Sequence, residues 1–405
     1  MGSQSAICSG VFHQAPIYRL DDRQDEPAKT LDELLKKNHA SHAALRNPRL
    51  LFHNHIPHAL GSSYLLGASS AKLEEIYTAE EPNLTAVDAG VVRYAIVAEN
   101  WRNHLAEKKY TAAYVDYFDD EIKKNGGNWN KVVHDHLFSG EAPLVNGFCG
   151  GLGHPYIHLA YGYEFNSKEV ISEALSLGCT EYDPTHKFLD NPPPDNSTYK
   201  TTSLGEMLTK VHKDKRFDRY SEHPGFANVF LLLGKYESEL LEHWNALVVE
   251  NTTTQFREWL RTTAILALST VDTEGYFDFF LAHVLTVGHA LRILLPLMPE
   301  DRRHTIMKQF GLFTTIVYLM QLRPSFGLDK IKPLKPDNSS WDLIYKRALE
   351  SKWSTDMHWP KVIRALKMVE EMRGPEDDLY KQAAAKFVSE FNGWTGFGRG
   401  SDDIP

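Results

Sequence analysis

Residues 276–297 read YFDFFLAHVLTVGHALRILLPL, and nearly every position around the helix they would form is apolar. A helix that is hydrophobic on all sides belongs in an interior rather than at a surface. We therefore predict a core helix here, and the rest of the fold is inferred from the segments around it. A histidine inside such a helix needs a polar partner, and this segment contains two, His283 and His289.

The helical period of apolar residues continues through most of the chain, whereas alternating β-branched strands do not occur. The predicted helices are 30–45 (with Thr30 and Glu33 as a capping box), 86–107, 227–249, 255–270 and 276–297. Breaks at 124–130, 183–200 and 323–340 are flanked by helices with buried faces, which favours loops over domain linkers. We predict a mostly α-helical protein: an extended arm over 1–30, then a single α-helical catalytic domain over 31–405.

Composition and charge narrow the class of partner. The chain has 405 residues, is 42% hydrophobic and carries a formal charge of −9 without basic runs, which disfavours nucleic acid and anionic membranes as partners. Three scattered cysteines, Cys8, Cys149 and Cys179, suggest a reducing compartment. The N-terminus lacks the pattern of a secretory signal, and we found no uninterrupted apolar run of about 20 residues. A cytoplasmic protein with a small-molecule or protein partner is expected; its oligomeric state is not indicated.

Several of the 19 histidines stand beside a proline at the beginning of an apolar helical segment. The three cases are His55-Ile-Pro-His58, His154-Pro-Tyr-Ile-His158 and His358-Trp-Pro-Lys361. Proline is well tolerated at the first position of a helix, so each segment should place a histidine at a helix N-terminus. There the chain can turn toward a shared cavity, which predicts that helix-borne residues converge on a central metal site.

Two of these segments leave the choice of ligand open. His154, His158 and Tyr161 share one helix face at spacings of four and three residues, and two such imidazoles can bind one metal. The alternative is that one histidine binds and the other hydrogen-bonds a neighbour. In the core helix, His283 and His289 are rotated by about 120° from each other, so one ion is not expected to take both. We prefer His283, because His289 lies beside Arg292.

Lys361 has an unusual predicted environment. If Pro360 opens the helix, Lys361, Ala365, Met368 and Met372 form one apolar stripe. A lysine aimed into a core should be paired, neutral or chemically modified. A neutral lysine amine can react with carbon dioxide to give an anionic carbamate that ligates metals. The alternative is a lysine whose amine extends to solvent.

Motifs of several other enzyme classes are missing. No G-x-S-x-G elbow, recognisable cysteine nucleophile motif or P-loop is present. The glycines in GFCGGLG (147–153) neither follow a βα pattern nor spell G-x-G-x-x-G. A flavin or nicotinamide site of the Rossmann type is therefore not supported.

Four ordered motifs, HNHIPH (53–58), GLGHPYIH (151–158), AHVLTVGHALR (282–292) and DMHWPK (356–361), resemble the questin oxidase-like family of fungal secondary metabolism. The likeness extends over roughly residues 45–395. The resemblance implies a mononuclear non-haem ferrous iron, with oxygen as co-substrate. By position, it implies the ligands His55, His154, His283, His358 and a carboxylated Lys361, whose carbamate derives from carbon dioxide. His58 and His158 either replace their neighbours as ligands or face the substrate.

The same resemblance implies an iron-dependent dioxygenase that opens the central ring of an anthraquinone-type polyketide. The family is also described as performing Baeyer–Villiger oxidation, so a flavin-independent monooxygenase that uses NADPH is one alternative. A metallohydrolase with a carboxylated lysine, and a non-enzymatic helical scaffold, are the others. We expect a neighbouring base to remove a phenolic proton from the substrate. The residues expected to serve the substrate are His58, His158 and Tyr161 as catalytic groups, and Phe279, Phe280, Trp101 and Tyr64 as available aromatic walls.

Overall fold

The apolar segment that begins at residue 276 forms the central helix of the protein. The computed structural model describes residue 12 and residues 14–47, 49–87, 96–332, 337–373 and 378–398. In it, α13 spans Phe279–Leu294 and continues into the 3-10 turn η8 (Leu295–Leu297). The Asp278 carboxylate caps α13 by accepting from the Leu281 amide at 2.9 Å. The predicted core helix is confirmed, except that its first three residues form strand β3 (Tyr276–Asp278).

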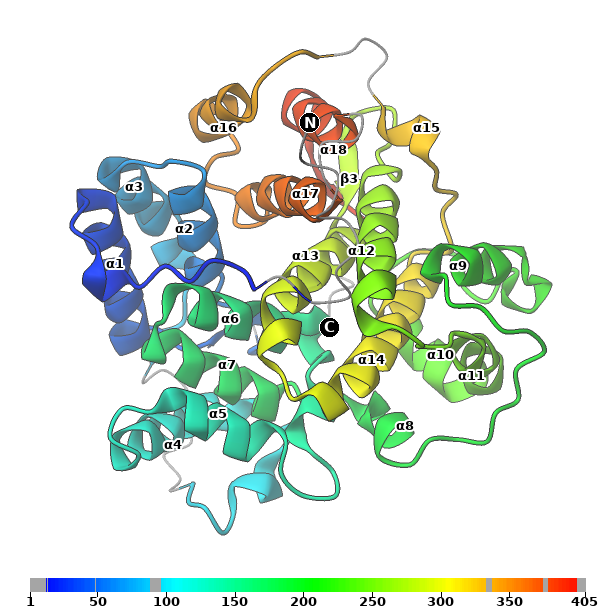
Figure 1. The fold of residues 1–405 in the computed structure, drawn as a ribbon, viewed down its shortest axis with the longest axis horizontal. Helices are drawn as coiled ribbons and strands as arrows, with labels where there is room; N and C mark the ends of the chain where they lie inside the picture. The colour runs from blue at the N-terminus through cyan, green and yellow to red at the C-terminus, as the bar shows by residue number, and fades with distance from the viewer. Residues whose placement is uncertain are drawn as a thin grey trace, which may run out of the picture.

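Four helices that are distant in the sequence form a closed ring. Helix α2 (Ile56–Leu65) contacts α6 (Gly150–Phe165), α6 contacts α13, α13 contacts α17 (Trp359–Arg373), and α17 returns to α2. Figure 1 shows α13 near the middle of the molecule, between α6 and α12, with α17 above it. This ring surrounds the site described below.

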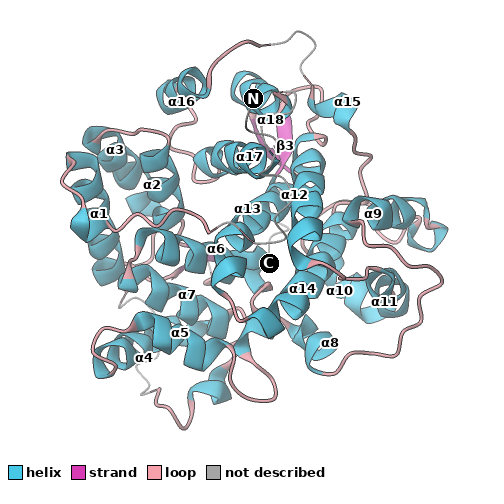
Figure 2. Ribbon diagram, in the orientation of Figure 1, coloured by secondary structure: helices cyan, strands magenta, loops and turns pink. Residues whose placement is uncertain are grey.

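The other elements pack around this ring, and the protein is predominantly α-helical, as predicted (Figure 2). The remaining α-helices are α1 (Glu26–Ser41), α3 (Ser70–Glu80), α4 (Thr111–Lys124), α5 (Trp129–Leu137), α7 (Lys168–Thr180), α8 (Lys187–Asp190), α9 (Leu204–Lys213), α10 (Asn228–Lys235), α11 (Glu237–Ala246), α12 (Thr252–Leu268), α14 (Glu300–Met320), α15 (Leu328–Ile331), α16 (Trp341–Glu350) and α18 (Leu379–Glu390). The other 3-10 turns are η1 (Leu20–Asp22), η2 (Glu81–Asn83), η3 (Trp101–His104), η4 (Lys108–Tyr110), η5 (Leu144–Gly147), η6 (Pro184–His186) and η7 (Lys215–Phe217).

Within the described residues, strands form only two small sheets. Strands β1 (Leu45–Arg46) and β2 (Phe52–His53) pair antiparallel, with Leu45 opposite His53. Strand β3 pairs in parallel with β4 (Gly393–Thr395), with Phe277 opposite Trp394. The second pair holds the C-terminal segment against the start of α13. A doubly wound sheet of the kind that binds dinucleotides is absent from this described part of the chain.

Several predicted boundaries were wrong. The first helix begins at Glu26 rather than Thr30, because Asp25 is the N-cap and accepts from the Ala28 amide. Thr30 lies inside α1 and donates its hydroxyl to Ser70. The predicted arm is therefore shorter than 1–30, and its residues 1–11 and 13 lie outside the described residues. The loop at 183–200 contains η6 and α8, and the one at 323–340 contains α15, with 333–336 outside the description.

Two predicted long helices also differ from the structure. Segment 227–249 forms two helices, α10 and α11, which meet at Tyr236 in a non-helical conformation. Segment 86–107 is not one helix: Ala86 forms a bridge with His42, residues 96–107 contain only the 3-10 turn η3, and 88–95 lie outside the description. Segment 255–270 is confirmed as α12, and the break at 124–130 as the turn between α4 and α5.

One helical stretch, Phe279–Leu297, is long and apolar enough to cross a membrane by length and composition. Because 83% of it is buried inside the protein, we interpret it as the core helix of the ring. Cys149 and Cys179 are buried free thiols, and Cys8 lies outside the described residues.

Candidate metal centre

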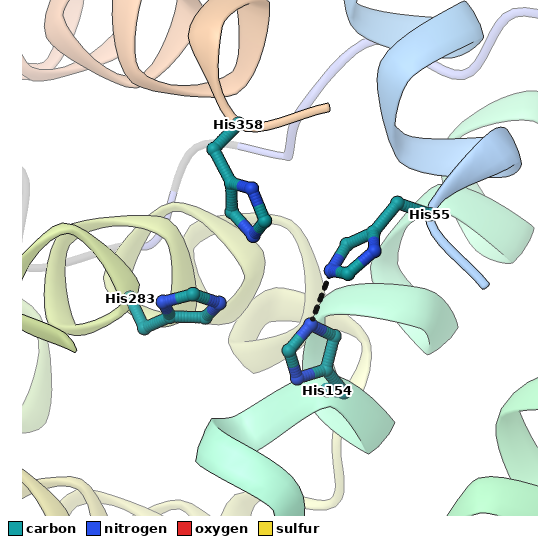
Figure 3. Close-up of side chains that lie close together, drawn as sticks. All are labelled: His55, His154, His283 and His358. Atoms are coloured by element: carbon teal, nitrogen blue, oxygen red, sulfur yellow. Dashed lines mark hydrogen bonds between the residues drawn. The ribbon is translucent and has the colours of Figure 1, made fainter. Parts of the chain in front are cut away.

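Four buried histidines meet inside the ring, one from each helix segment. One ring nitrogen from each of the four lies within 4.8 Å of the others. Neighbouring ring centroids are 4.6 to 5.1 Å apart around a closed circuit. Figure 3 shows their nitrogens turned toward a common point. The residues are His55, His154, His283 and His358, which we call the histidine cluster.

His55 and His358 are positioned by polar caps at helix starts. His55 is the N-cap residue of α2, and the buried Asn54 side chain accepts from the Ile56 amide at 3.1 Å. His358 directly precedes α17, and Asp356 accepts from the amides of His358 and Trp359 at 2.8 and 2.9 Å. The prediction that histidines beside proline lie at helix N-termini is confirmed for both.

His154 follows a left-handed turn in which two of the three residues are glycines. Gly151, Leu152 and Gly153 have φ values of 54°, 57° and 75°. A Cβ on Gly153 would lie 2.3 Å from Val287 Cγ2, and one on Gly151 would lie 2.6 Å from His53 Nε2. Gly153 therefore permits the close approach of the turn to α13, and Gly151 permits its close approach to His53. The regular helix starts at His154.

Hydrogen bonds fix the orientation of two cluster rings. His154 Nδ1 bonds the Gly151 carbonyl, and His283 Nδ1 bonds the Phe279 carbonyl at 2.8 Å. A carbonyl only accepts, so in both rings Nδ1 carries the proton and Nε2 carries a lone pair. The Nε2 atoms of His283 and His358 are buried without a hydrogen-bond partner. Such unpartnered polar atoms are costly in a core unless something binds them.

The spacing of the nitrogens fits a metal ion. His55 Nε2 and His154 Nε2 lie 2.9 Å apart. Bonds of about 2.0–2.1 Å from one ion to imidazole place neighbouring nitrogens about 3 Å apart. Two lone pairs that face each other at this distance need a proton or a cation between them. Imidazole suits zinc, copper, iron and nickel, so the donor set alone does not select the metal.

The cluster histidines are neutral at physiological pH, as metal ligands must be. Burial lowers the pKa of His283 to about 3. Burial also holds the pKa of His55, His154 and His358 well below the ordinary value, and the nearby Lys361 lowers each further. Lys361 is therefore near enough to act electrostatically on the cluster.

Lys361 lies in the first turn of α17 and is 1% exposed. Its Nζ has no hydrogen-bond partner. Burial lowers the pKa of this amine to about 7, and Asp356 opposes the shift only in part. The predicted burial is confirmed. The stripe argument was partly wrong, because Met368 and Met372 are only half-buried while this first turn is buried on all sides.

His58 and His158 lie beside the cluster and bond each other. His58 Nε2 and His158 Nδ1 are 3.0 Å apart, and His158 Nε2 lies 2.7 Å from Glu173. The sequence left open which histidine of each motif is the metal ligand. In the structure, His55 and His154 belong to the cluster, whereas His58 and His158 form a separate pair. His58 is 5.7 Å from His55 between ring centroids, so the pair adjoins the cluster.

Tyr161 and His289 are also buried near this ring of helices. The Tyr161 hydroxyl bonds Ser62 at 2.5 Å, its ring lies 5.1 Å from that of His58, and Arg364 lies over it. His289 stays outside the cluster, where nearby Arg364 and Arg292 help burial to lower its pKa. The preference for His283 over His289 as a cluster member therefore agrees with the geometry.

One histidine next to the cluster was missed. His53 stacks on His154 with centroids 3.7 Å apart, and its Nε2 lies 3.2 Å from Glu181 Oε1. Glu181 in turn bonds Lys108 at 2.6 Å. His53 is part of the HNHIPH motif, but it lies in a strand and is not next to a proline. The sequence therefore gave no signal that it lies beside the cluster.

Aromatic residues border the cluster on one side. The Phe279 ring lies 4.6 Å from those of both His283 and His358, and it also contacts Trp394 and Phe397. Trp394 and Phe397 come from the C-terminal segment that β4 holds in place. We call Phe279, Trp394 and Phe397 the aromatic wall; all three are half-buried.

The other aromatic residues considered from the sequence lie elsewhere. Phe280 is buried against Phe397. Trp101 packs on His136, and Tyr64 lies near the arm, with its hydroxyl 3.4 Å from Asp25. Tyr64 is nine residues beyond His55, so α2 carries it about 13 Å along the helix axis.

A second aromatic region is a cleft beside the left-handed turn. Residues 150–152 and the Glu181–Lys108 pair contribute to its lining. Its apolar lining includes Phe226, Phe230 and Phe313. Gly151 and Leu152 of the turn that precedes His154 line this cleft.

Comparison with known proteins places the chain. The model of the questin oxidase-like family matches residues 52–366, a range that contains the histidine cluster and Lys361. The chain belongs to the questin oxidase-like family. It is 26% identical over 400 residues to a Baeyer-Villiger oxidase of Pestalotiopsis microspora, covering 92% of this chain and 88% of that protein. It is 23% identical over 385 residues to the questin oxidase of Aspergillus fumigatus, covering 88% and 84%.

Proposed function

We propose that this questin oxidase-like protein is a non-haem iron-dependent dioxygenase that opens the central ring of an anthraquinone-type polyketide. The observation that carries the proposal is the convergence of four neutral, buried imidazoles beside an unpartnered lysine. Relatives named questin oxidase and Baeyer-Villiger oxidase over most of the chain support an oxidative reaction on such a substrate.

In this proposal, His55, His154, His283, His358 and a carboxylated Lys361 hold the iron. The carbamate forms when the neutral amine attacks carbon dioxide and releases a proton. It would convert a buried, unpaired nitrogen into an anionic oxygen donor. Ferrous iron bound by this set supplies the one-electron chemistry that lets dioxygen react with an organic ring.

The protein's own groups would hold and deprotonate the substrate. We place the flat substrate against the aromatic wall, because the Phe279 ring lies against two cluster rings. His58 is the proposed base for a phenolic proton, since it adjoins the cluster and its Nδ1 is buried without a partner. Burial of the surrounding residues keeps water away.

The proposal is tested by reconstituting the protein with ferrous iron without oxygen and then adding an anthraquinone or its hydroquinone with ¹⁸O₂. We expect one iron per chain, oxygen uptake and two labelled atoms in each ring-opened product. Two zinc ions per chain without oxygen uptake would instead favour a metallohydrolase.

A second candidate is a flavin-independent Baeyer–Villiger monooxygenase, which the names of several relatives favour. Such a reaction inserts one oxygen atom next to a carbonyl, and NADPH reduces the other atom to water. The same labelling experiment separates the two: one labelled atom per product, with NADPH consumed in equal amount, would support the monooxygenase.

A further inference from the structure

A continuous line of hydrogen bonds leads from the edge of the histidine cluster to the protein surface. His58 Nε2 lies 3.0 Å from His158 Nδ1, and His158 Nε2 lies 2.7 Å from Glu173 Oε2. The other oxygen of Glu173 lies 3.0 Å from His39 Nδ1, and His39 Nε2 lies 2.9 Å from Asp119. The line joins five helices, namely α2, α6, α7, α1 and α4.

Exposure increases steadily along this line. His58 and His158 are fully buried, and the side chains of Glu173, His39 and Asp119 are 3%, 15% and 44% exposed. One end is therefore in the core and the other is in water. Every member can both take up and release a proton, because each is an imidazole or a carboxylate.

The donors and acceptors have one consistent direction. Burial raises the pKa of Glu173, but bonds from His158 and His39 outweigh it and lower the pKa overall, so this group is a carboxylate that only accepts. His158 must then carry its proton on Nε2, and its Nδ1 accepts from His58 Nε2–H. The remaining nitrogen of His58, Nδ1, is left with a lone pair, and it is buried without a partner.

A purely structural network would be expected to satisfy both of its ends. Here the inner end is an unsatisfied base and the outer end is a half-exposed carboxylate. Glu173 also bonds two histidines, one through each carboxylate oxygen. A single charged partner would have been enough to stabilise this buried carboxylate. These features are typical of a path for protons.

We propose that His158, Glu173, His39 and Asp119 form a proton relay that connects His58 with solvent. The proposal rests on the proposed function, in which His58 takes the phenolic proton. As Nδ1 of His58 gains that proton, Nε2–H passes to His158 Nδ1, and His158 Nε2–H passes to Glu173. Once protonated, Glu173 no longer balances the charge of the His39 cation, so His39 releases its Nε2–H to Asp119 and then to water. One proton enters, one leaves, and no group is oxidised or reduced.

The relay can be tested in metal-free protein, without any turnover. With ¹⁵N-histidine labelling, NMR should show His58 and His158 as neutral Nε2–H tautomers and His39 as a cation at pH 8. The side-chain N–H of His58 should exchange with solvent deuterium at least tenfold more slowly in Glu173→Gln, because an amide keeps the size but cannot pass a proton. Glu169→Gln, on the same helix and bonded to Ser167, is the matched control and should change nothing.

Turnover of the iron-loaded protein gives a second readout. His39→Ala should keep its iron but lose at least tenfold in rate, and added imidazole should restore the rate in proportion to its concentration. An Nδ1–H tautomer for His158, or equal N–H exchange in Glu173→Gln and wild type, would overturn the relay. If exchange slows as expected but no anthraquinone is oxidised, the relay stands and the proposed function fails.

Discussion

Lys361 carries a buried amine with no hydrogen-bond partner, next to four neutral imidazoles. A buried ammonium without a counter-charge costs several kcal/mol, so the amine should be neutral or modified. Asp356 is the carboxylate that acts on Lys361, but it already accepts from two backbone amides and from Trp394. We therefore propose a carbamate as the modification of this amine.

Replacing Lys361 should show whether this residue is a metal ligand or only fills space in the core. Lys361→Met keeps the length and apolar volume, and we expect the fold to remain while iron binding weakens at least tenfold. Lys361→Arg should fail equally, because a guanidinium cannot form a carbamate, and Lys361→Glu should recover a minor part through its carboxylate. Iron analysis checks all three, and ¹³C NMR after incubation with ¹³C-bicarbonate checks the carbamate itself. Full iron in Lys361→Met would show that the lysine is only a core residue.

The position of a single residue could be predicted where it stood at a helix start or followed a pattern of buried residues. Histidines beside proline and the buried lysine were recognised in this way. His55 and His58 could not be separated, because both lie within one turn and the deciding feature is the N-cap conformation of His55, with φ −97° and ψ 2°. Glu173 and His39 were missed because their partners come from other helices, and sequence spacing contains no information on such pairs.

At the scale of elements, the left-handed turn before α6 sets the position of His154. The turn uses three consecutive residues with positive φ, and Gly153 lies against Val287 of α13. The sequence did not indicate that the regular helix starts at His154. Local backbone conformation also explains the wrong helix boundaries at Thr30 and Tyr236. The N-cap at Asp25 and the non-helical conformation of Tyr236 set these boundaries, and the spacing of apolar residues does not reveal them.

Gly153→Ala should disturb the centre through this turn. Its Cβ would clash with Val287 and its φ of 75° is strained for alanine, so we expect a loss of about 1–3 kcal/mol in stability and weaker iron binding. Gly234→Ala in α10 is the control, because nothing lies within 4 Å of its added Cβ. Thermal unfolding and iron titration measure both effects. Unchanged iron affinity in Gly153→Ala would mean that the turn does not position His154.

At the scale of the whole molecule, the centre ties together four segments that span residues 55 to 361. A ligand that binds only the folded state stabilises it by RT ln(1 + [L]/Kd), or about 2.7 kcal/mol at 100 times Kd. Ferrous iron added without oxygen should therefore raise the melting temperature by several degrees, and a chelator should reverse the gain. A melting temperature independent of both would contradict a metal shared by the four helices.

The outer half of the relay should make stability depend on pH. Burial lowers the pKa of His39, but its bonds to Asp119 and Glu173 outweigh this and raise it to about 10. Because the folded pKa lies above the unfolded value of about 6.5, the contribution is complete below pH 6.5 and is lost as the pH rises through 10. The stability advantage of wild type over His39→Gln, about 1–3 kcal/mol after screening at Asp119, should shrink between pH 7 and 9.5. Urea unfolding of both proteins at pH 7 and 9.5 measures this difference in stability. A difference that grows with pH would contradict a stabilising ion pair at His39.

The general architecture was more predictable than the packing. Helical period, proline-rich breaks and one apolar helix were sufficient for a mostly α-helical protein with a central core helix. The closure of α2, α6, α13 and α17 into a ring could not be predicted, because it depends on contacts between segments up to 300 residues apart. The histidine motifs indicated that these four segments meet, without indicating their order.

The most direct test of the central claim compares two histidines of the same core helix. His283 and His289 are both buried in α13 with unsatisfied ring nitrogens, but only His283 belongs to the histidine cluster. Wild type, His283→Ala and His289→Ala are loaded with ferrous iron without oxygen, desalted, and analysed for iron per chain. We predict one iron in wild type and in His289→Ala, and at least a tenfold loss in His283→Ala with its helical content retained. Equal iron in the two variants would contradict a metal held by the histidine cluster.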